Sequence, residues 1–262
     1  SDMEKLATKL SEIVSSSFIN QVAKKLNKGT IKQFSDASYS STLKKLIRTQ
    51  KAKLKKRIDN DKLKKAIEDI YQKANTYNKN ILYSSIKTEI GLDLNNIIKS
   101  DGLQSFIKAK TLETLSYYQK HINDLEAQLE TSILRNANAG SSFEKIIEEL
   151  HELARQGDNK ARFLARNEMG TFSGQITKKR GQKLGVKKAI WKASMDERTR
   201  PSHEDRHNKE FDIDNGCYSS IDGMYLNVGE DFNCRCTMTM VIDPAEMLGL
   251  SEDDIQEVEN KL

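Results

Sequence analysis

Apolar residues recur every three to four positions through much of residues 1–75, a spacing that places them on one face of a helix. Gly29, Gly91 and Gly102 mark breaks in the helical pattern, and no Pro occurs before residue 201. We therefore predict amphipathic helices that form an extended arm or a bundle. The repeat comprises Leu6, Leu10, Ile13, Val14, Leu43, Leu46, Ile47, Ile58, Leu63, Ile67, Ile70 and Tyr71.

The same period predicts one long helix between residues 106 and 134. His121 falls inside this segment, where a structural or solvated role is expected for it. Its apolar positions are Phe106, Ile107, Leu112, Leu115, Tyr118, Ile122, Leu125, Leu129 and Ile133. Residues 1–139 contain no motif that points to chemistry, so contacts with other proteins are the expected role of this part.

Residues 140–190 are interpreted as helix, glycine, helix. Gly140 ends the preceding element, and Ser141 with Glu144 has the spacing of a capping box. Gly157 suits the left-handed residue after a helix, and Asp158 can cap the next helix at once. The second helix carries small residues that allow another element to pack closely: Ala161, Ala165, Gly170, Ser173 and Gly174.

The last seventy residues predict a small α+β module. KKAIWKAS, residues 187–194, and NCRCTMTMVI, residues 233–242, alternate as strands do, with Pro201 and a glycine-rich stretch between them. Short helices are expected after Pro244 and after Ser251. The predicted fold is mainly α: a helical N-terminal part, residues 1–139, and a C-terminal module, residues 140–262.

Composition limits the class of protein. The 262 residues allow about two domains. With 13 Gly and 2 Pro, the chain is not collagen-like or rich in Pro linkers. The sequence contains no run of about 18 apolar residues, so no membrane span is predicted. Residues 1–10 lack the apolar core of a signal peptide. An odd number of cysteines, three, does not make a disulfide framework and favours a reducing compartment.

Charge is distributed unevenly along the chain. The balance is +11 over residues 1–100, −3 over 101–150, +8 over 151–200 and −11 over 201–262. The basic blocks predict sequence-independent contact with the phosphates of double-stranded DNA; the alternative is a solvated helix face. The candidate residues are Lys51, Lys53, Lys55, Lys56, Arg57, Lys178, Lys179 and Arg180.

All three cysteines and two of the four histidines lie between residues 203 and 236. Thiolate and imidazole are the usual zinc ligands, and structural sites hold four of them. The candidate set is His203, Cys217, Cys234 and Cys236, with His207 as a substitute for His203 or Cys217. The Cys-x-Cys pair is shorter than the usual zinc spacing, so two buried, metal-free thiols are the alternative.

The order of four pieces of sequence resembles the phage head-morphogenesis family typified by the F protein of phage Mu, over about residues 140–242. The pieces are ARNE (165–168), KKAIWKASMDERTRPSH (187–203), a glycine-containing turn, and GEDFNCRC (229–236). The chain has Asn167 where the family usually has Thr, and HNKEFDIDNG where it often has Leu-Asp-Gly. The matched residues are Arg166, Glu168, Trp191, Asp196, Arg198, Arg200, His203, Cys234, Arg235 and Cys236.

The resemblance implies a minor head protein of a tailed phage or prophage, acting in head assembly or DNA delivery. Such proteins lie inside the virion head, and in the host cytoplasm during assembly. Their partners are the portal protein, capsid or scaffold components and packaged DNA, and self-association stays open. We expect a protein without enzyme activity, with the nuclease described next as the alternative.

Two further readings come from the residues alone. A metal-dependent nuclease or toxin-like module is the alternative function, because His203, His207 and Asn208 lie near acidic residues and Cys234 and Cys236. An ion-pair network of Asp196 with Arg198 or Arg200 is the predicted structural role of those residues.

Overall fold

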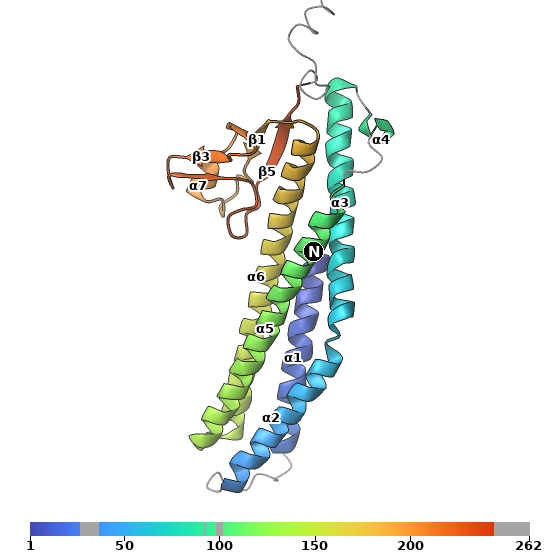
Figure 1. Ribbon diagram of the computed structural model, residues 1–262. Coiled ribbons are helices and arrows are strands. Elements are labelled where there is room, and N and C mark those ends of the chain that lie inside the picture. Colours follow the sequence, from blue (N-terminus) through green and yellow to red (C-terminus); the bar gives the residue numbers. More distant parts are fainter. Residues whose placement is uncertain (27–36, 92, 98–101, 244–262) are drawn as a thin grey trace, which may run out of the picture. The chain divides into compact units, whose positions relative to one another are not determined.

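The computed structural model describes residues 1–26, 37–91, 93–97 and 102–243, and its fold is mainly α, as predicted (Figure 1). The helices are α1 (Asp2–Leu26), α2 (Ala37–Arg57), α3 (Asn60–Ile90), α4 (Leu94–Ile97), α5 (Gln104–Asn138), α6 (Phe143–Lys183) and α7 (Pro201–Asp205). The strands are β1 (Lys188–Lys192), β2 (Glu210–Asp212), β3 (Cys217–Ser219), β4 (Met224–Leu226) and β5 (Thr237–Val241). The helices expected after Pro244 and Ser251 lie outside the described residues.

The chain divides into two compact units. Unit 1 comprises Ser1–Ile70 and Thr111–Arg166, and unit 2 comprises Tyr71–Lys110 and Asn167–Leu262. The divisions between them fall inside helices α3, α5 and α6. The domain boundary expected between residues 139 and 140 stays a prediction. Within the described ranges, no helix is long and apolar enough to cross a membrane.

Unit 1 is a helical bundle that buries most of the apolar positions read from the sequence, with Leu112, 53% exposed, as an exception. Polar contacts also join its helices: Lys51 of α2 pairs with Glu130 of α5, and Arg166 of α6 pairs with Glu4 of α1. Burial of the apolar side chains supplies most of the stability of such a bundle. Fully or almost fully buried positions include Met3, Val14, Phe18, Ile47, Leu54, Ile67, Leu125, Leu129, Ile133, Ile146 and Leu150.

Gly157 does not break the chain into two helices, which corrects the prediction of helix, glycine, helix. Helix α6 runs without interruption from Phe143 to Lys183. Gly157 is buried, and a Cβ atom there would lie 2.9 Å from the Cδ atoms of Leu125 in helix α5. The glycine is therefore explained by the close approach of α5 and α6, not by a turn.

The turn before α6 follows the sequence closely, with a shift of one residue at the cap. Gly140 has φ +67° and ends α5, as predicted. The first turn of α6 is capped by Ser142, whose Oγ accepts a hydrogen bond from the backbone N–H of Lys145 at 3.3 Å. The predicted cap, Ser141, lies one position too early.

Unit 2 combines the ends of α3 and α6 with two small sheets. β1 is the central strand of the first sheet, in the order β2-β1-β5, and all its neighbours are antiparallel. The two predicted strands pair with each other, and Trp191 of β1 is opposite Met238 of β5. β3 and β4 form a separate antiparallel pair. Figure 1 shows these strands beside the C-terminal end of α6.

The core of unit 2 joins the sheet to α3 and the turn after α6. Ala189 and Trp191 of β1 are fully buried, whereas Lys188, the first residue of the same strand, is exposed. This alternation is why β1 could be predicted as a strand with one apolar face. Other members of the core are Leu82, Tyr83, Ile86, Leu94, Leu184, Val186, Phe211, Ile213, Val228 and Met240.

Candidate metal centre

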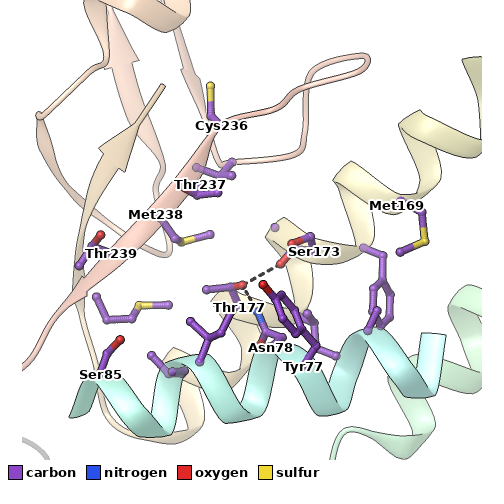
Figure 2. A pocket seen from close by; sticks show the side chains of 18 of the residues that line it. Tyr77, Asn78, Ser85, Met169, Ser173, Thr177, Cys236, Thr237, Met238 and Thr239 are labelled. Atoms are coloured by element: carbon purple, nitrogen blue, oxygen red, sulfur yellow. Dashed lines mark hydrogen bonds between the residues drawn. The ribbon is translucent and has the colours of Figure 1, made fainter. Parts of the chain in front are cut away.

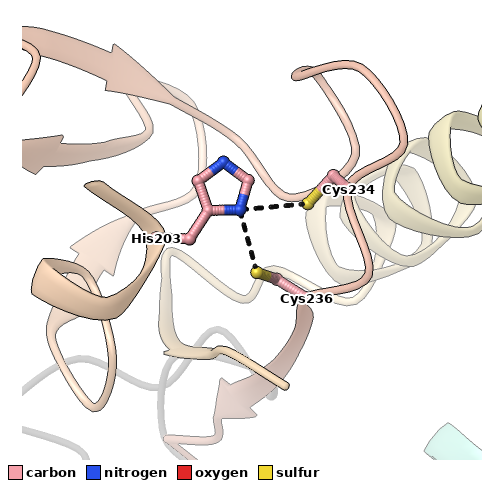
Figure 3. Close-up of side chains that lie close together, drawn as sticks. All are labelled: His203, Cys234 and Cys236. Atoms are coloured by element: carbon pink, nitrogen blue, oxygen red, sulfur yellow. Dashed lines mark hydrogen bonds between the residues drawn. The ribbon is translucent and has the colours of Figure 1, made fainter. Parts of the chain in front are cut away.

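Three potential metal ligands meet between helix α7 and the loop before β5 (Figure 3). The Sγ atoms of Cys234 and Cys236 lie 3.9 and 3.3 Å from the same ring nitrogen, Nδ1 of His203. All three ligand atoms lie within 4.8 Å of one another. One imidazole nitrogen and two sulfurs on a common centre form a donor set that zinc accepts, so the cluster can hold a metal ion.

The other ring nitrogen of His203 is already engaged. Its Nε2 lies 3.0 Å from Oδ2 of Asp231, and the ring itself is buried. A carboxylate at Nε2 favours a proton on that nitrogen, so Nδ1 is the ring nitrogen available to a metal ion. Asp231 therefore orients the ring and does not share the ligand face.

The cluster favours negative charge on sulfur. Hydrogen bonding with Cys236, and next with His203, lowers the pKa of Cys234 to about 4. The same contact with Cys234 raises the pKa of Cys236. Cys234, followed by Asp231, raises the pKa of His203 against the effect of burial. These directions favour a thiolate at Cys234, and a bound cation would favour loss of the second thiol proton.

Backbone packing fixes the loop that carries the cysteines. A Cβ atom on Gly174 of α6 would overlap the carbonyl oxygen of Val228. One on Gly170 would lie 2.8 Å from the carbonyl oxygen of Cys234. Gly229, with φ +87°, would place one 2.7 Å from the carbonyl oxygen of Gly170. The small residues predicted to allow close packing thus include two glycines that touch this loop directly.

Asn167 and Glu168 of the ARNE sequence have separate structural roles. The Asn167 side-chain oxygen accepts a hydrogen bond from the backbone N–H of Asn233 at 2.9 Å, which ties α6 to the loop. Glu168 forms a buried ion pair with Lys110 at 3.1 Å. Arg166 pairs instead with Glu4 of α1 at 3.1 Å.

Arg206 supports the module from its interior, and sequence reasoning missed it. Its guanidinium is fully buried and lies 5.5 Å from the Trp191 ring. It binds both carboxylate oxygens of Asp222 at 2.9 and 3.0 Å, and donates to the carbonyl oxygens of Ser202, Cys217 and Met224. All five N–H donors are used. The charged stretch around it hid this residue, because no local pattern separates a buried arginine from an exposed one.

The predicted ion pairs of Asp196 have different partners. Asp196 pairs with Arg235, and both side chains are partly exposed. Arg200 pairs instead with Asp231 at 3.3 Å and donates to the carbonyl oxygen of Phe232 at 2.8 Å. Arg198 donates its backbone N–H, and not its guanidinium, to Oδ1 of Asp196 at 3.1 Å. Because these contacts join residues that are distant in sequence, adjacency of charges in DERTR could not reveal them.

Trp191 and His207 lie next to the cluster without joining its ligand atoms. The rings of Trp191 and His203 are 5.6 Å apart and nearly perpendicular. Nδ1 of His207 accepts the backbone N–H of Ala193 at 3.1 Å, so this ring braces the end of β1. Cys217 is buried at β3 and is not among the described ligand atoms that cluster with His203.

The predicted DNA-contacting residues fall in different environments. Lys53, Lys55 and Lys56 at the end of α2 are exposed. Lys51 pairs with Glu130, and Arg57 donates to Ser17 at 3.1 Å. In the other basic block, Lys179 lies over the Phe106 ring and Lys178 donates to the carbonyl oxygen of Asp214.

Arg180 does not belong to a basic surface, which corrects its assignment as a DNA contact. Its side chain is buried in unit 2 and donates to the side-chain oxygens of Asn75 and Asn78. The helical position that faces α3 explains why this member of the KKR run differs from its neighbours.

An apolar cavity of about 520 Å³ lies between α3, α6 and β5. Figure 2 shows Tyr77, Asn78 and Ser85 of α3 on one side and Thr237–Thr239 on the other. The Asn78 amide donates to Thr177 Oγ1 at 2.7 Å. Most of the lining is apolar or carries hydroxyl groups, and it lacks a group of metal ligands among the described residues. Its chemistry suits apolar contact better than catalysis.

Residues 127–239 match the model of the family described as Phage Mu protein F like protein. An uncharacterized protein of Haemophilus influenzae is 24% identical over 166 residues, which cover 63% of this chain and 36% of that protein. A protein of Enterococcus faecalis named NAD(+)--arginine ADP-ribosyltransferase EFV is 28% identical over 160 residues, covering 56% of this chain and 32% of that protein. The chain thus spans about a third of the length of these curated relatives. No solved structure shows a significant match.

The matched region contains the whole of α6, the metal-ligand cluster and most of the two sheets. It also contains every residue on which the resemblance was based. Residues 127–239 are therefore similar to the Phage Mu protein F like family, the family that the sequence resembles.

Proposed function

We propose that the chain forms part of a minor head protein of a tailed phage or prophage, and that it associates with the portal during head assembly or DNA delivery. The family match over residues 127–239 carries this proposal. In it, a helical part, residues 1–139, precedes the family module, residues 140–262. The protein acts inside the virion head and, during assembly, in the host cytoplasm.

Portal association is tested with the purified chain and the portal protein from the same phage or prophage. We expect the two to elute together in size-exclusion chromatography, with light scattering to give the stoichiometry and the self-association of the chain alone. A Tyr77→Ser, Ile81→Ser variant asks whether the exposed apolar side chains beside the α3 cavity contribute, since they are 69% and 50% exposed. Absence of any complex with portal or capsid components argues against the proposal.

Contact with double-stranded DNA is the second part of the proposed role. The exposed lysines at the end of α2 support it, because they can reach phosphates without losing an ion pair recorded among the described residues. Such binding is independent of sequence and weakens steeply with salt. Arg180 is excluded from this surface by its burial.

A gel-shift titration at two salt concentrations tests the DNA contact. Replacing Lys53, Lys55 and Lys56 by Gln should weaken binding and reduce the dependence on salt. The matched control replaces three other exposed lysines, Lys108, Lys120 and Lys145, by Gln, so that the net charge is the same. Equal weakening by both sets means that total charge, and not the α2 end, determines binding.

We also propose that the His203, Cys234 and Cys236 cluster binds one zinc ion. Two observations support this proposal. The three ligand atoms lie close together, and Asp231 holds the imidazole through its other nitrogen, Nε2. The ion would join helix α7 to the loop before β5 and so stabilise the module. Cys217, predicted as a fourth ligand, is tested separately.

Elemental analysis after expression in zinc-containing medium should find about one zinc per chain. Cys234→Ser should lose the zinc, whereas Cys217→Ser should keep it, since both are buried thiols but only Cys234 lies in the cluster. A zinc-free wild-type chain contradicts the metal proposal. Loss of zinc in Cys217→Ser with an intact fold would instead make Cys217 a ligand.

We propose that this chain is not itself an enzyme. The name of the Enterococcus faecalis relative describes a protein about three times longer than its match to this chain, so the proposal leaves that activity with the relative. Incubation with NAD⁺ and candidate acceptor proteins should give no transfer of ADP-ribose. Incubation of labelled duplex DNA with Mg²⁺ or Zn²⁺ should leave it uncut; cutting that disappears in His203→Ala would establish the nuclease alternative.

A further inference from the structure

A small cavity opens onto the ligand cluster at His203 and Cys236. Its volume is about 20 Å³, enough for one water molecule. Three arginines border it: Arg198, Arg200 and Arg235. The ligand cluster therefore has a protein-filled side and a side that faces a positively charged opening.

The described residues offer no fourth ligand within the cluster. Asp231 already bonds to Nε2, on the opposite side of the imidazole from the sulfurs. Neither Cys217 nor His207 is among the ligand atoms that cluster with His203. Zinc normally has four ligands, and sites with three protein ligands fill the fourth position with water or a bound molecule.

The charges around the cavity favour an anion at that position. Arg200 is paired with Asp231, and Arg235 is paired with Asp196. Within the part of the chain that the structure describes, the exposed guanidinium of Arg198 has no recorded partner, and only its backbone N–H bonds to Asp196. Three arginines and two carboxylates leave an excess of one positive charge beside the opening.

We propose that the metal ion held by His203, Cys234 and Cys236 keeps its fourth position open to this cavity, where an oxygen of a phosphate group binds next to Arg198. This inference rests on the metal ion proposed above. One phosphate oxygen occupies the water-sized cavity, and the remaining oxygens contact the arginines at its mouth. Guanidinium groups recognise phosphate through paired hydrogen bonds. The phosphate comes either from free phosphate or from the DNA backbone, and the two sources are distinguished experimentally.

Cobalt(II) can report both metal binding and phosphate binding, because it replaces zinc and its visible absorption depends on its ligands. Addition of cobalt to the metal-free full chain should produce thiolate charge-transfer bands. Titration with inorganic phosphate should then shift the visible bands. Acetate at the same concentration should shift them less, since a carboxylate provides fewer oxygens for the arginines. A short duplex oligonucleotide is titrated in parallel, and a shift at lower phosphate concentration than with the free ion identifies DNA as the source.

Arg198→Gln should bind cobalt normally and weaken the phosphate response about tenfold, the effect of one charge-assisted contact. Arg162→Gln is the control, because Arg162 is exposed on α6 and pairs with Asp158. If cobalt binds but phosphate leaves the bands unchanged, or acetate acts equally, this inference is wrong and the metal proposal stands. If no thiolate band appears, both are wrong.

Discussion

Nε2 of His203 lies 3.0 Å from Oδ2 of Asp231, while Nδ1 of the same ring faces two cysteine sulfurs. One ring nitrogen bonds to the carboxylate and the other can bind a metal ion, as in metal centres where a carboxylate orients the histidine. Asp231 also lies in the loop that carries the cysteines, and its backbone carbonyl accepts the N–H of Cys234. The orientation of the imidazole and the position of the sulfurs are thus set by one segment.

Asp231→Ala should weaken zinc binding by about 10- to 100-fold, because the imidazole loses the partner that fixes its proton and its orientation. Competition with a chromophoric zinc chelator measures the change. Glu204→Ala is the matched control: Glu204 is an exposed carboxylate next to His203 on α7 and should leave the affinity unchanged. Equal affinity of the wild type and Asp231→Ala would show that Asp231 does not position the ligand.

Arg206→Lys should lower the free energy of unfolding of the module by about 3 kcal/mol, since a buried charge pair loses its planar fork. Lysine cannot satisfy Asp222 and three carbonyl oxygens together. Urea unfolding followed by fluorescence measures this loss of stability. Trp191, the single tryptophan, is a suitable probe because Arg206 packs on its indole ring. Arg200→Lys is the control; its side chain is 45% exposed, so the loss should be under about 1 kcal/mol. Equal losses would contradict the assigned role of Arg206.

Sequence patterns predicted those elements whose burial is periodic. The alternation around Trp191 and the helical repeat from Phe106 to Ile133 each reflect one apolar face packed on a core, and both elements were found. Two of the predicted metal candidates, Cys234 and Cys236, also lie together with His203, although the strand expected over both cysteines begins only at Thr237 and both lie in the loop before it.

The remaining features depend on contacts between distant segments. Gly157 has the sequence signature of a helix end, yet its role is set by Leu125 in another helix. In the sequence, Arg180 and Arg206 look like exposed basic residues. In the structure, α3 covers Arg180 and the β3–β4 loop covers Arg206. The identity of such a neighbour is absent from any local window of sequence, so the partner of Asp196 was also assigned wrongly.

Gly174→Ala should destabilise the module by about 2 kcal/mol, because overpacking costs more than the helical preference of alanine returns. The added methyl group would overlap the backbone oxygen of Val228, which cannot rotate away as a side chain can. Urea unfolding with Trp191 fluorescence provides the measurement. Ser173→Ala, at the exposed neighbouring position of α6, should change stability by less than about 0.5 kcal/mol. A stabilised Gly174→Ala would mean that the loop moves freely off the helix.

His121 should make the helical unit less stable as the pH falls below about 6.5. The ring is buried in unit 1, with Nε2 3.5 Å from Ser11 Oγ, and burial lowers its pKa from 6.5. Below pH 6.5 the unfolded chain therefore binds a proton that the folded chain does not. Stability falls through this range by up to about 1.4 kcal/mol per pH unit and levels off below the folded-state pKa.

Urea unfolding followed by circular dichroism at a series of pH values measures this dependence. His121→Gln should flatten the slope between pH 7.5 and the acid range, because the titrating ring is gone. His151→Gln should retain the wild-type slope, since His151 is exposed on α6 and has no buried ring to protonate. If both variants keep the wild-type slope, burial of His121 does not couple protonation to folding, and the acidic residues of the bundle must account for the pH dependence.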